Sequence, residues 1–339
     1  MTGNRVRPTM KDVAGRAGVA LKTVSRVVNG EPGVRPQVIE RVHSAIAELG
    51  YRRNEGARLL RKGQTASLGL VLEDIGDPFY STLSRAVEDV AHQHASLLLT
   101  GSSDEDPDRE RELTLAFCAR RVDGLIIIPA SENHAYLLPE IAAGTAAVFV
   151  DRPPGQIEAD TVLSDNRRGA REGVAHLLGA GHRRIGYLGD APQIYTAARR
   201  HEGYLAAMAD AGQPVDPSWV TMTPLDRESV AQAMARMTGG PAPVTALFCG
   251  NNRATALALR ELRGLSAAGL RLALVGFDDF ELADLVTPGT TVVAQDTAGL
   301  GRIAAELLFQ RLAGDRDPAR RIKLPTRLIV RGSGEIPPA

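Results

Sequence analysis

Hydrogen-bonding side chains gather on one face of a short helix predicted near the N-terminus. In residues 21–29, Val24, Val27 and Val28 have the spacing of a buried helical stripe. The opposite face carries Leu21, Lys22, Ser25, Arg26 and Asn29. The face is therefore polar and basic, which suits contact with a polyanion, and the alternative is a solvated basic surface.

Capping residues and turns flank this helix on both sides. Thr9 can cap a preceding helix, with Asp12 three residues later as in a capping box. Gly18 supplies a sharp turn, Pro36 suits the first position of a third helix, and Gly50 ends that helix. Two short helices joined by a turn and braced by a third predict a helix-turn-helix, whose second helix fits the major groove. The alternative is a small three-helix packing unit.

The formal net charge of zero hides a strong asymmetry along the chain. Residues 1–62 hold 13 Lys and Arg against 5 Asp and Glu, a net charge of +8. The other 277 residues hold 27 against 35, a net charge of −8. A basic head on an acidic body indicates that the head meets a polyanion and the body does not.

Short apolar runs alternate with amphipathic stretches from residue 67 onward. The runs of strand length are 68–72, 96–100, 124–129, 146–150, 184–188, 245–249 and 272–276. Helical patterns lie between them, for example over 81–94 and 169–178. This alternation predicts parallel sheets with helices on both faces. Since ligands bind beyond the carboxyl ends of such strands, we expect a binding cleft there.

The run from Thr9 to Asn29, TMKDVAGRAGVALKTVSRVVN, closely resembles the DNA-binding head of the lactose-repressor (LacI/GalR) family of bacterial transcription regulators. The resemblance continues through residues 46–51 and 54–60. It implies that Leu21 and Lys22 read bases and that Thr9 anchors the DNA backbone. Lys11 is a further candidate phosphate contact, with a solvated surface charge as the equal alternative. Contacts to base edges and phosphates are also implied for Thr23, Ser25, Arg26 and Asn29. Ala20 and Arg35 replace the polar residues usual before the second and third helices, so weaker capping is expected there.

The segment after the third helix resembles the hinge helix of that family. Asn54 can cap it, and Ala57 is small enough for two such helices to approach closely. Leu60 matches a leucine that wedges between base pairs and kinks the duplex at the operator centre. The alternative is a flexible basic linker. The expected organisation is a helix-turn-helix domain over 1–52, a hinge and linker over 53–66, and a core over 67–339.

The core resembles the two lobes of the periplasmic-binding-protein fold. The expected fold class is therefore an all-α helix-turn-helix head followed by an α/β core of two doubly wound parallel sheets. We expect an N-terminal lobe over about 67–163 and 293–325, and a C-terminal lobe over about 164–292 and 326–339. The chain then crosses between the lobes near Leu163, Val292 and Pro325.

The resemblance also places effector-binding residues in the cleft between the lobes. The candidates are Phe79, Tyr80, Asp151, Thr196, Arg200, Asn251, Asp278 and Gln295. The aromatic pair lies in Asp77-Pro-Phe-Tyr80, which resembles the family motif Asn-Pro-Phe-Phe, and its alternative role is lid or core packing. Asn252 stands where the family usually has Asp, which puts the local hydrogen bonding in doubt.

Arg, Asn and Asp around a cleft suit a polyhydroxylated ligand, because buried polar groups need partners. A sugar or sugar acid is the leading effector class. It would control the operator binding of a repressor, most simply as an inducer. The alternative regulator is corepressor-dependent and binds a nucleobase. Less favoured are an exported solute-binding protein and an enzyme of the α/β class. Neither of these alternatives explains the predicted helix-turn-helix, because neither implies specific DNA binding.

Other features of the sequence narrow the function. No Walker A, GxGxxG, HExxH or GxSxG pattern occurs, so no enzyme activity, catalytic residue, metal site or cofactor is expected. The N-terminus lacks a secretory h-region, and no apolar run is long enough for a membrane span, which predicts a cytoplasmic protein. Cys118 and Cys249 are expected to be reduced. The expected partners are a pseudo-palindromic double-stranded operator, a small-molecule effector and a second copy in a homodimer.

Overall fold

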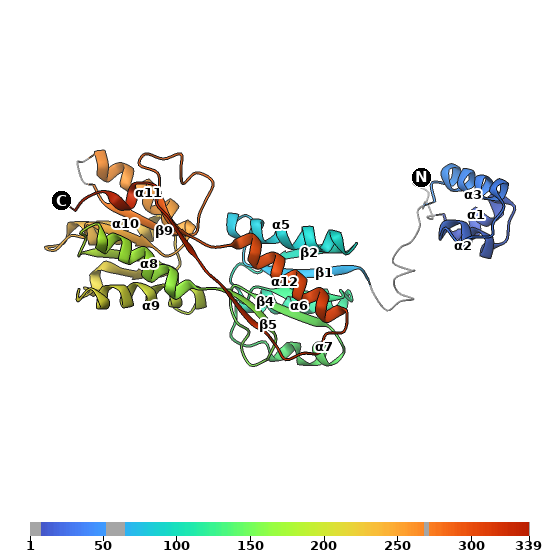
Figure 1. Ribbon diagram of the computed structural model, residues 1–339, viewed down its shortest axis with the longest axis horizontal. Coiled ribbons are helices and arrows are strands. Elements are labelled where there is room, and N and C mark those ends of the chain that lie inside the picture. The colour runs from blue at the N-terminus through green and yellow to red at the C-terminus, as the bar shows by residue number, and fades with distance from the viewer. Residues whose placement is uncertain (1–7, 52–64, 268–270, 339) are drawn as a thin grey trace, which may run out of the picture. The chain divides into compact units, whose positions relative to one another are not determined.

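The computed structural model describes residues 8–51, 65–267 and 271–338. The chain divides into two compact units, Met1–Thr65 and Ala66–Ala339, each with its own core (Figure 1). The first unit is helical, and the second contains two six-stranded sheets. This is the predicted fold class.

Three helices form the first unit: α1 (Met10–Ala17), α2 (Leu21–Val28) and α3 (Pro36–Leu49). The predicted capping box is present, because the Thr9 hydroxyl accepts from the Asp12 amide while the Asp12 carboxylate accepts from the Thr9 amide at 2.7 Å. Gly18 ends α1 in the left-handed conformation that a tight turn requires. Neither α2 nor α3 has a side-chain cap, as Ala20 and Arg35 predict.

A small apolar core holds these helices together. Val13, Val24 and Val42 contribute one fully buried side chain from each helix, and Tyr51 closes the cluster. Spacings of three and four residues place these side chains on inward faces, so the outer face of α2 stays available.

Two sheets with the same strand order form the second unit. The first sheet has the order β11-β5-β4-β3-β1-β2, and the second has the order β12-β10-β9-β8-β6-β7. All neighbouring strands are parallel except β12, which runs antiparallel to β10 at the edge of the second sheet. The second sheet therefore departs slightly from the all-parallel prediction. The matching order makes the two lobes structural repeats of each other.

The N-lobe contains the first sheet and the helices that cover it. Its elements are β1 (Ser67–Leu72), α5 (Pro78–Gln93), β2 (Leu97–Ser102), α6 (Pro107–Ala119), β3 (Gly124–Ile127), α7 (Leu138–Ala142), β4 (Ala146–Val150), β5 (Asp160–Ser164), α12 (Thr297–Leu312) and β11 (Arg321–Leu324). Adjacent strand residues point to opposite faces, and here both faces are apolar: Leu70 packs in one cluster and Val71 in another.

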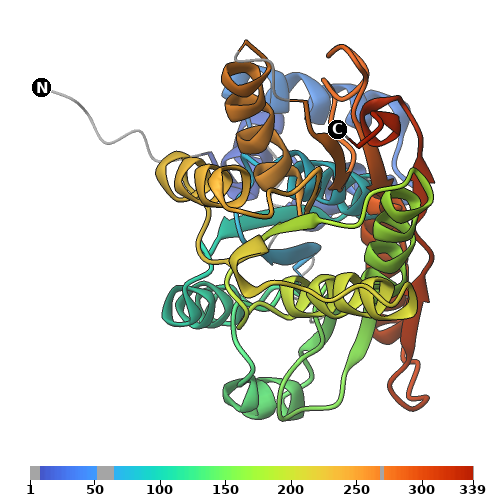
Figure 2. The ribbon, with the colours of Figure 1, turned by 90° about the vertical axis from the view of Figure 1, so that its left-hand side faces the viewer.

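The C-lobe contains the second sheet. Its elements are α8 (Asn166–Gly179), β6 (Ile185–Gly189), α9 (Tyr195–Asp210), β7 (Val220–Met222), α10 (Arg227–Gly239), β8 (Ala246–Cys249), α11 (Asn252–Ala267), β9 (Ala273–Phe277), β10 (Thr291–Ala294) and β12 (Arg327–Ile329). Tyr187 and Phe248 pack with α8 and α9, whereas Leu188 and Leu247 pack with α10 and α11. Figure 2 shows these helix pairs on opposite sides of the sheet.

The chain passes between the lobes three times (Figure 1). The passages follow β5, β10 and β11, after Ser164, Ala294 and Leu324. Val292 lies inside β10, so the second passage falls after Ala294 rather than at Val292. Because each sheet takes strands from distant parts of the sequence, residues of one cleft come from segments more than 200 residues apart.

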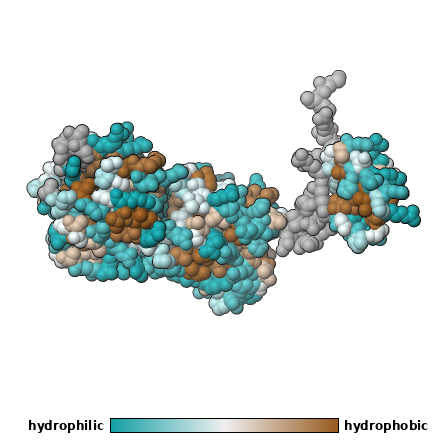
Figure 3. Space-filling view, turned by 45° about the horizontal axis from the view of Figure 1, so that its top comes forward, coloured by the Kyte–Doolittle hydropathy of each residue, from teal (hydrophilic) through white to brown (hydrophobic). Residues whose placement is uncertain are grey.

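The surface of both units mixes hydrophilic and hydrophobic residues (Figure 3). No helix in the described ranges has the length and apolar character needed to cross a membrane. Cys118 is half-buried and Cys249 is buried, and neither is part of a disulfide. Burial raises the pKa of the Cys249 thiol to about 12, which keeps it protonated and unreactive.

Candidate functional site

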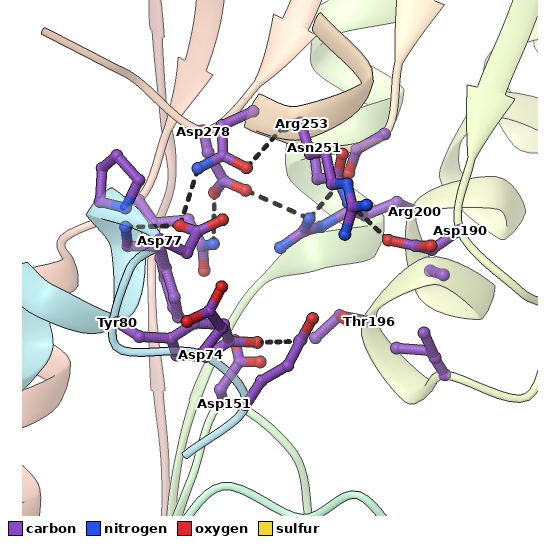
Figure 4. Close-up of a pocket in the computed structure, with 18 of the residues that line it drawn as sticks. Asp74, Asp77, Tyr80, Asp151, Asp190, Thr196, Arg200, Asn251, Arg253 and Asp278 are labelled. Carbon is purple, nitrogen blue, oxygen red and sulfur yellow. Dashed lines mark hydrogen bonds and ion pairs between the residues drawn. The ribbon is translucent and has the colours of Figure 1, made fainter. Parts of the chain in front are cut away.

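A polar cavity of about 390 Å³ lies between the lobes. All eight predicted effector residues line it, and Figure 4 shows side chains from both lobes converging on it. Most of the lining follows the carboxyl ends of strands: Asp151 comes directly after β4, Asp278 after β9 and Gln295 after β10. This is the expected place for a ligand in a parallel α/β sheet.

Asp151 and Asp278 occupy equivalent positions in the two lobes. Both adopt the left-handed backbone region, with φ of 68° and 70°. The Asp151 amide donates to Val162 O at 2.8 Å, and the Asp278 amide donates to Val293 O at 2.9 Å. Non-glycine residues in this conformation are held in place by their surroundings and concentrate at functional sites. The repeat thus aims two carboxylates into one cavity.

Arg200 organises the C-lobe wall. Gly203 lets α9 pack closely on α8, because a Cβ there would lie 2.3 Å from Arg167 O. The buried guanidinium of Arg200 then donates to Asn166 Oδ1 and Gly250 O, both at 2.7 Å, and to Asp278 Oδ2 at 3.3 Å. Its plane also lies 4.0 Å from the centre of the Phe277 ring. Arg200 is therefore fixed before any ligand binds.

Arg152 organises the N-lobe wall, and its role there was not predicted. Its guanidinium donates to Glu105 Oε2 at 2.8 Å, to Pro129 O at 2.8 Å and to Glu73 Oε2 at 3.2 Å. The signal available in the sequence was its position beside Asp151, directly after an apolar strand.

Tyr80 belongs to this N-lobe network rather than to an open stacking surface. Its hydroxyl donates to Glu73 Oε2 at 2.6 Å and accepts from Arg152, and its ring is buried in the N-lobe core. Phe79 is only half-buried, and its ring meets that of Tyr80 edge-on with centroids 5.1 Å apart. Core packing, an alternative considered for this pair, thus accounts for Tyr80, whereas Phe79 packs partly against the same core and also lines the cavity.

Burial raises the pKa values of four acids that line the cavity. Burial, together with the nearby charge of Glu105, raises the pKa of Glu73 to about 7. Burial also raises the pKa of Asp151 and of Asp278, against the opposing effects of Arg152 and Arg200. The pKa of Asp190 is likewise raised by burial, although the hydrogen bond from Asn251 opposes this. These carboxylates are desolvated more than their partners compensate.

Buried acceptors without partners remain in the cleft. Asp151 Oδ1 and Gln295 Oε1 have no hydrogen-bond partner among the described residues. Asp151 is only 3% exposed, so water satisfies it poorly. An unpaired buried acceptor costs free energy that a ligand donor can recover.

Acidic side chains outnumber basic ones around the cavity. Six carboxylates line it, with three guanidinium groups. Sequence reasoning missed several of these charged residues: Glu73, Asp74, Asp77, Arg152, Asp190 and Arg253. Most of them directly follow a strand or begin the next helix, which is the signal that could have found them. Among the described residues no group of three or more His, Cys, Asp or Glu side chains is arranged to hold a metal ion.

The outer face of α2 forms a second candidate site, in the helical unit. Leu21, at the start of the helix, is 44% exposed. Lys22 and Lys11 are also exposed, and no ion pair involves either of them within the described residues. Thr23 and Ser25 are half-buried on the same helix. This arrangement leaves Leu21 and Lys22 available to contact another molecule.

Arg26 and Asn29 are engaged within the unit itself. Arg26 donates to Pro32 O and lies 3.7 Å from the Glu31 carboxylate, while Asn29 Nδ2 donates to Glu31 Oε1 at 3.2 Å. Glu31, which sequence reasoning did not single out, therefore positions both side chains. The predicted hinge residues Asn54, Ala57 and Leu60 lie outside the described residues.

A helix-turn-helix and a two-lobed α/β unit with a polar cleft, joined in one chain, define a class of ligand-responsive DNA-binding proteins. Residues 9–54 match the family described as bacterial regulatory proteins, lacI family. Residues 174–334 match a periplasmic binding protein-like domain.

Relatives cover nearly the whole chain. The transcriptional regulator GalS of Salmonella typhimurium is 33% identical over 319 residues, which are 91% of each chain. Catabolite control protein A of Priestia megaterium is 30% identical over 96% of this chain and 98% of its own. The lac repressor dimer, solved with operator and the anti-inducer ONPF, has a TM-score of 0.84 at 26% identity and covers 97% of this chain and 99% of its own. The chain belongs to the lacI family and is a DNA-binding transcriptional regulator.

Proposed function

We propose that this chain is a homodimeric repressor whose binding to an operator is controlled by a small molecule in the interlobe cleft. The observation that carries the proposal is the cavity, with fixed polar groups from both lobes and unpaired acceptors at Asp151 and Gln295. Related structures support it: the lac repressor is a dimer bound to operator and an anti-inducer, and the regulator CelR is a complex with cellobiose. The proposed mechanism does not involve catalysis. We propose that the protein acts in the cytoplasm, because its DNA partner lies there.

The charge of the cavity favours one part of the sugar class. The lining holds twice as many carboxylates as guanidinium groups, and Arg152 and Arg200 are already paired with acids. A sugar acid or sugar phosphate would add negative charge to this desolvated site. A neutral or amino-bearing polyhydroxylated ligand would instead donate to Asp151 and Gln295. The effector class is therefore sugars and their derivatives without a negative charge.

Homodimer formation is supported by the exposed edge of the N-lobe sheet. Leu97 and Leu99 in β2 are 72% and 36% exposed, although strands of parallel sheets are normally covered. A two-fold dimer matches a pseudo-palindromic operator. Asn54, Ala57 and Leu60 are proposed to supply the central DNA contacts, with Leu60 as the wedge.

Selection of bound duplexes from genomic fragments tests DNA recognition. We expect the full-length chain to enrich a palindromic site at near-physiological salt, since phosphate contacts make binding salt-dependent. Lys22→Ala should relax preference at one base position in each half-site, at a cost of about 1–3 kcal/mol. Lys11→Ala is the matched control, because the same change on α1 should weaken binding to all sequences alike. A wild-type chain that enriches no site, with or without effector, contradicts the proposal.

A panel of ligands matched in shape and differing in charge tests the effector class. Neutral hexoses, the corresponding amino sugars, sugar acids, sugar phosphates and nucleobases are compared for their effect on thermal unfolding and on operator affinity. We expect the responding compound to be a neutral or amino sugar. A response to sugar acids alone, or to nucleobases alone, contradicts this assignment.

A further inference from the structure

One hydrogen bond joins the two walls of the cleft directly. Asn252 Nδ2, at the start of α11 in the C-lobe, donates to Asp77 Oδ1 in the N-lobe at 2.9 Å. Asp77 is also the N-cap of α5, and the same oxygen accepts from the Phe79 amide at 2.8 Å. Asn252 is only 8% exposed, so the bond lies where water competes weakly. Residues 175 positions apart thus connect the N-terminal ends of two helices in different lobes.

The C-lobe end of this bond is connected to the candidate effector residue Asp278. Arg200 donates both to Asp278 Oδ2 and to Gly250 O, two residues before Asn252. The backbone amide of Asn252 also faces the Asp278 carboxylate and counteracts the rise in its pKa. A ligand that pulls on Asp278 or Arg200 must therefore move the 250–252 segment and the amide of Asn252 with it.

The N-lobe end is connected to α5 and through it to the N-lobe core. Helix α5 buries Leu83 and Val87 against Leu300 and Ala304 of α12. Gly301 of α12 allows close approach, because a Cβ there would lie 2.4 Å from Leu83 O. Closely packed helices move together, so displacement at Asp77 moves α5 and α12 as one body.

The residue types at the two ends match each other. The bond needs one carboxylate acceptor and one amide donor, and an acid at both positions would place two negative charges in contact. This chain has one of each, Asp77 in the N-lobe and Asn252 in the C-lobe.

We propose that the Asn252–Asp77 hydrogen bond is the contact through which occupancy at Asp278 sets the spacing of the lobes, and thereby the operator affinity of the chain. This deepens the proposed function and rests on it. Asn252 is a positioning residue in this account, because its side chain acts through Asp77 and α5. An effector can shift the equilibrium between two lobe spacings only if it binds one spacing more tightly than the other. The hydrogen bond contributes to the free-energy difference between those two spacings.

The test introduces repulsion between residues 77 and 252 of the full-length chain and then removes it with a second substitution. Asn252→Asp sets two carboxylates against each other, and the exchange variant Asp77→Asn/Asn252→Asp restores one amide and one carboxylate. We expect Asn252→Asp to change operator affinity about tenfold, within the range of allosteric coupling energies, and the exchange variant to return to within about twofold of wild type. Gln232→Glu is the control: it makes the same amide-to-acid change beside Glu228 on α10, inside one lobe, and should leave operator affinity unchanged.

Two outcomes of the operator-affinity measurements would overturn the proposal. Operator affinity that is unchanged in Asn252→Asp shows that the bond is not coupled to DNA binding. An altered affinity that the exchange variant fails to restore shows that Asn252 acts locally and not through Asp77. Denaturant unfolding followed by Trp219 fluorescence, for the same variants, separates these effects from misfolding. If wild type binds no operator, the proposed function fails. The unfolding measurements with Asp77→Asn added complete a double-mutant cycle, and absence of coupling between residues 77 and 252 in that cycle refutes the bond itself.

Discussion

The two lobes share one strand order but neutralise their cleft charges differently. In the C-lobe, Arg200 faces a single carboxylate, Asp278, and two uncharged oxygens. In the N-lobe, Arg152 lies among Glu73, Glu105 and Asp151. The C-lobe wall is therefore close to balanced, whereas the N-lobe wall carries excess negative charge.

This difference shows how a duplicated fold can acquire two distinct binding surfaces. The backbone repeat supplies an aspartate in the left-handed conformation to each lobe, at positions 151 and 278. The surrounding side chains decide whether that aspartate is engaged. Asp278 accepts from Gln295 at 2.6 Å, while one oxygen of Asp151 has no partner among the described residues. Asp278 is thus held by its neighbours before a ligand binds, whereas Asp151 keeps one oxygen that a ligand donor can reach.

Removing the central arginine of each lobe should have the largest effect. Arg152→Ala leaves three carboxylates together, and we expect it to lower the free energy of unfolding by about 4–5 kcal/mol. Arg200→Ala leaves one carboxylate and should cost about 3 kcal/mol. Denaturant unfolding monitored by Trp219 compares them. Adding Glu73→Gln should restore part of the stability lost in Arg152→Ala and none of that lost in Arg200→Ala. Equal losses of stability in the two arginine variants, without this selective rescue, would contradict the proposed difference in charge between the two walls.

The pH dependence of stability should differ between wild type and Glu73→Gln. The pKa of Glu73 is raised to about 7 in the folded state, above its unfolded value of 4.5. The folded state therefore binds the proton more tightly, so this contribution is present below pH 4.5 and is lost as the pH rises to about 7. Between pH 5 and 7.5 we expect wild type to lose about 2 kcal/mol relative to Glu73→Gln. Parallel stability profiles for the two proteins would contradict this.

Neutralising the two equivalent aspartates should have the smallest effect on stability. Asp278→Asn weakens the buried pair with Arg200 and should cost about 1–2 kcal/mol. Asp151→Asn leaves Arg152 with two other carboxylates, so we expect a change below about 1 kcal/mol. Both variants should nevertheless lose the effector response of operator binding. A full response in Asp151→Asn would show that the unpaired oxygen does not contact the ligand.

The sequence predicted the helices and turns of the first unit more completely than the side-chain contacts in the N-lobe wall of the cavity. The head depends on local signals, namely the Thr9–Asp12 cap, Gly18 and the valine spacing of α2, and each of them acts within a few residues. Arg152 and Tyr80 could not be assigned in this way. Arg152 depends on Glu73 and Glu105, which lie 79 and 47 residues away in the sequence, and Tyr80 meets Arg152 across 72 residues.

The amino-acid sequence by itself determined the helix-turn-helix, the alternation of strands and helices, and a cleft at the carboxyl ends of the strands. These follow from short-range capping, from hydrophobic periodicity and from the rule that parallel strands present their carboxyl ends to ligands. The eight candidate residues around that cleft were implied by the resemblance to the family motifs. Only the tertiary structure decided which acids share an arginine, which oxygen lacks a donor, and that Asn252 reaches Asp77 across the cleft. The reason is that such contacts depend on how buried charges from distant segments are brought together, and desolvation makes each of them depend on its neighbours.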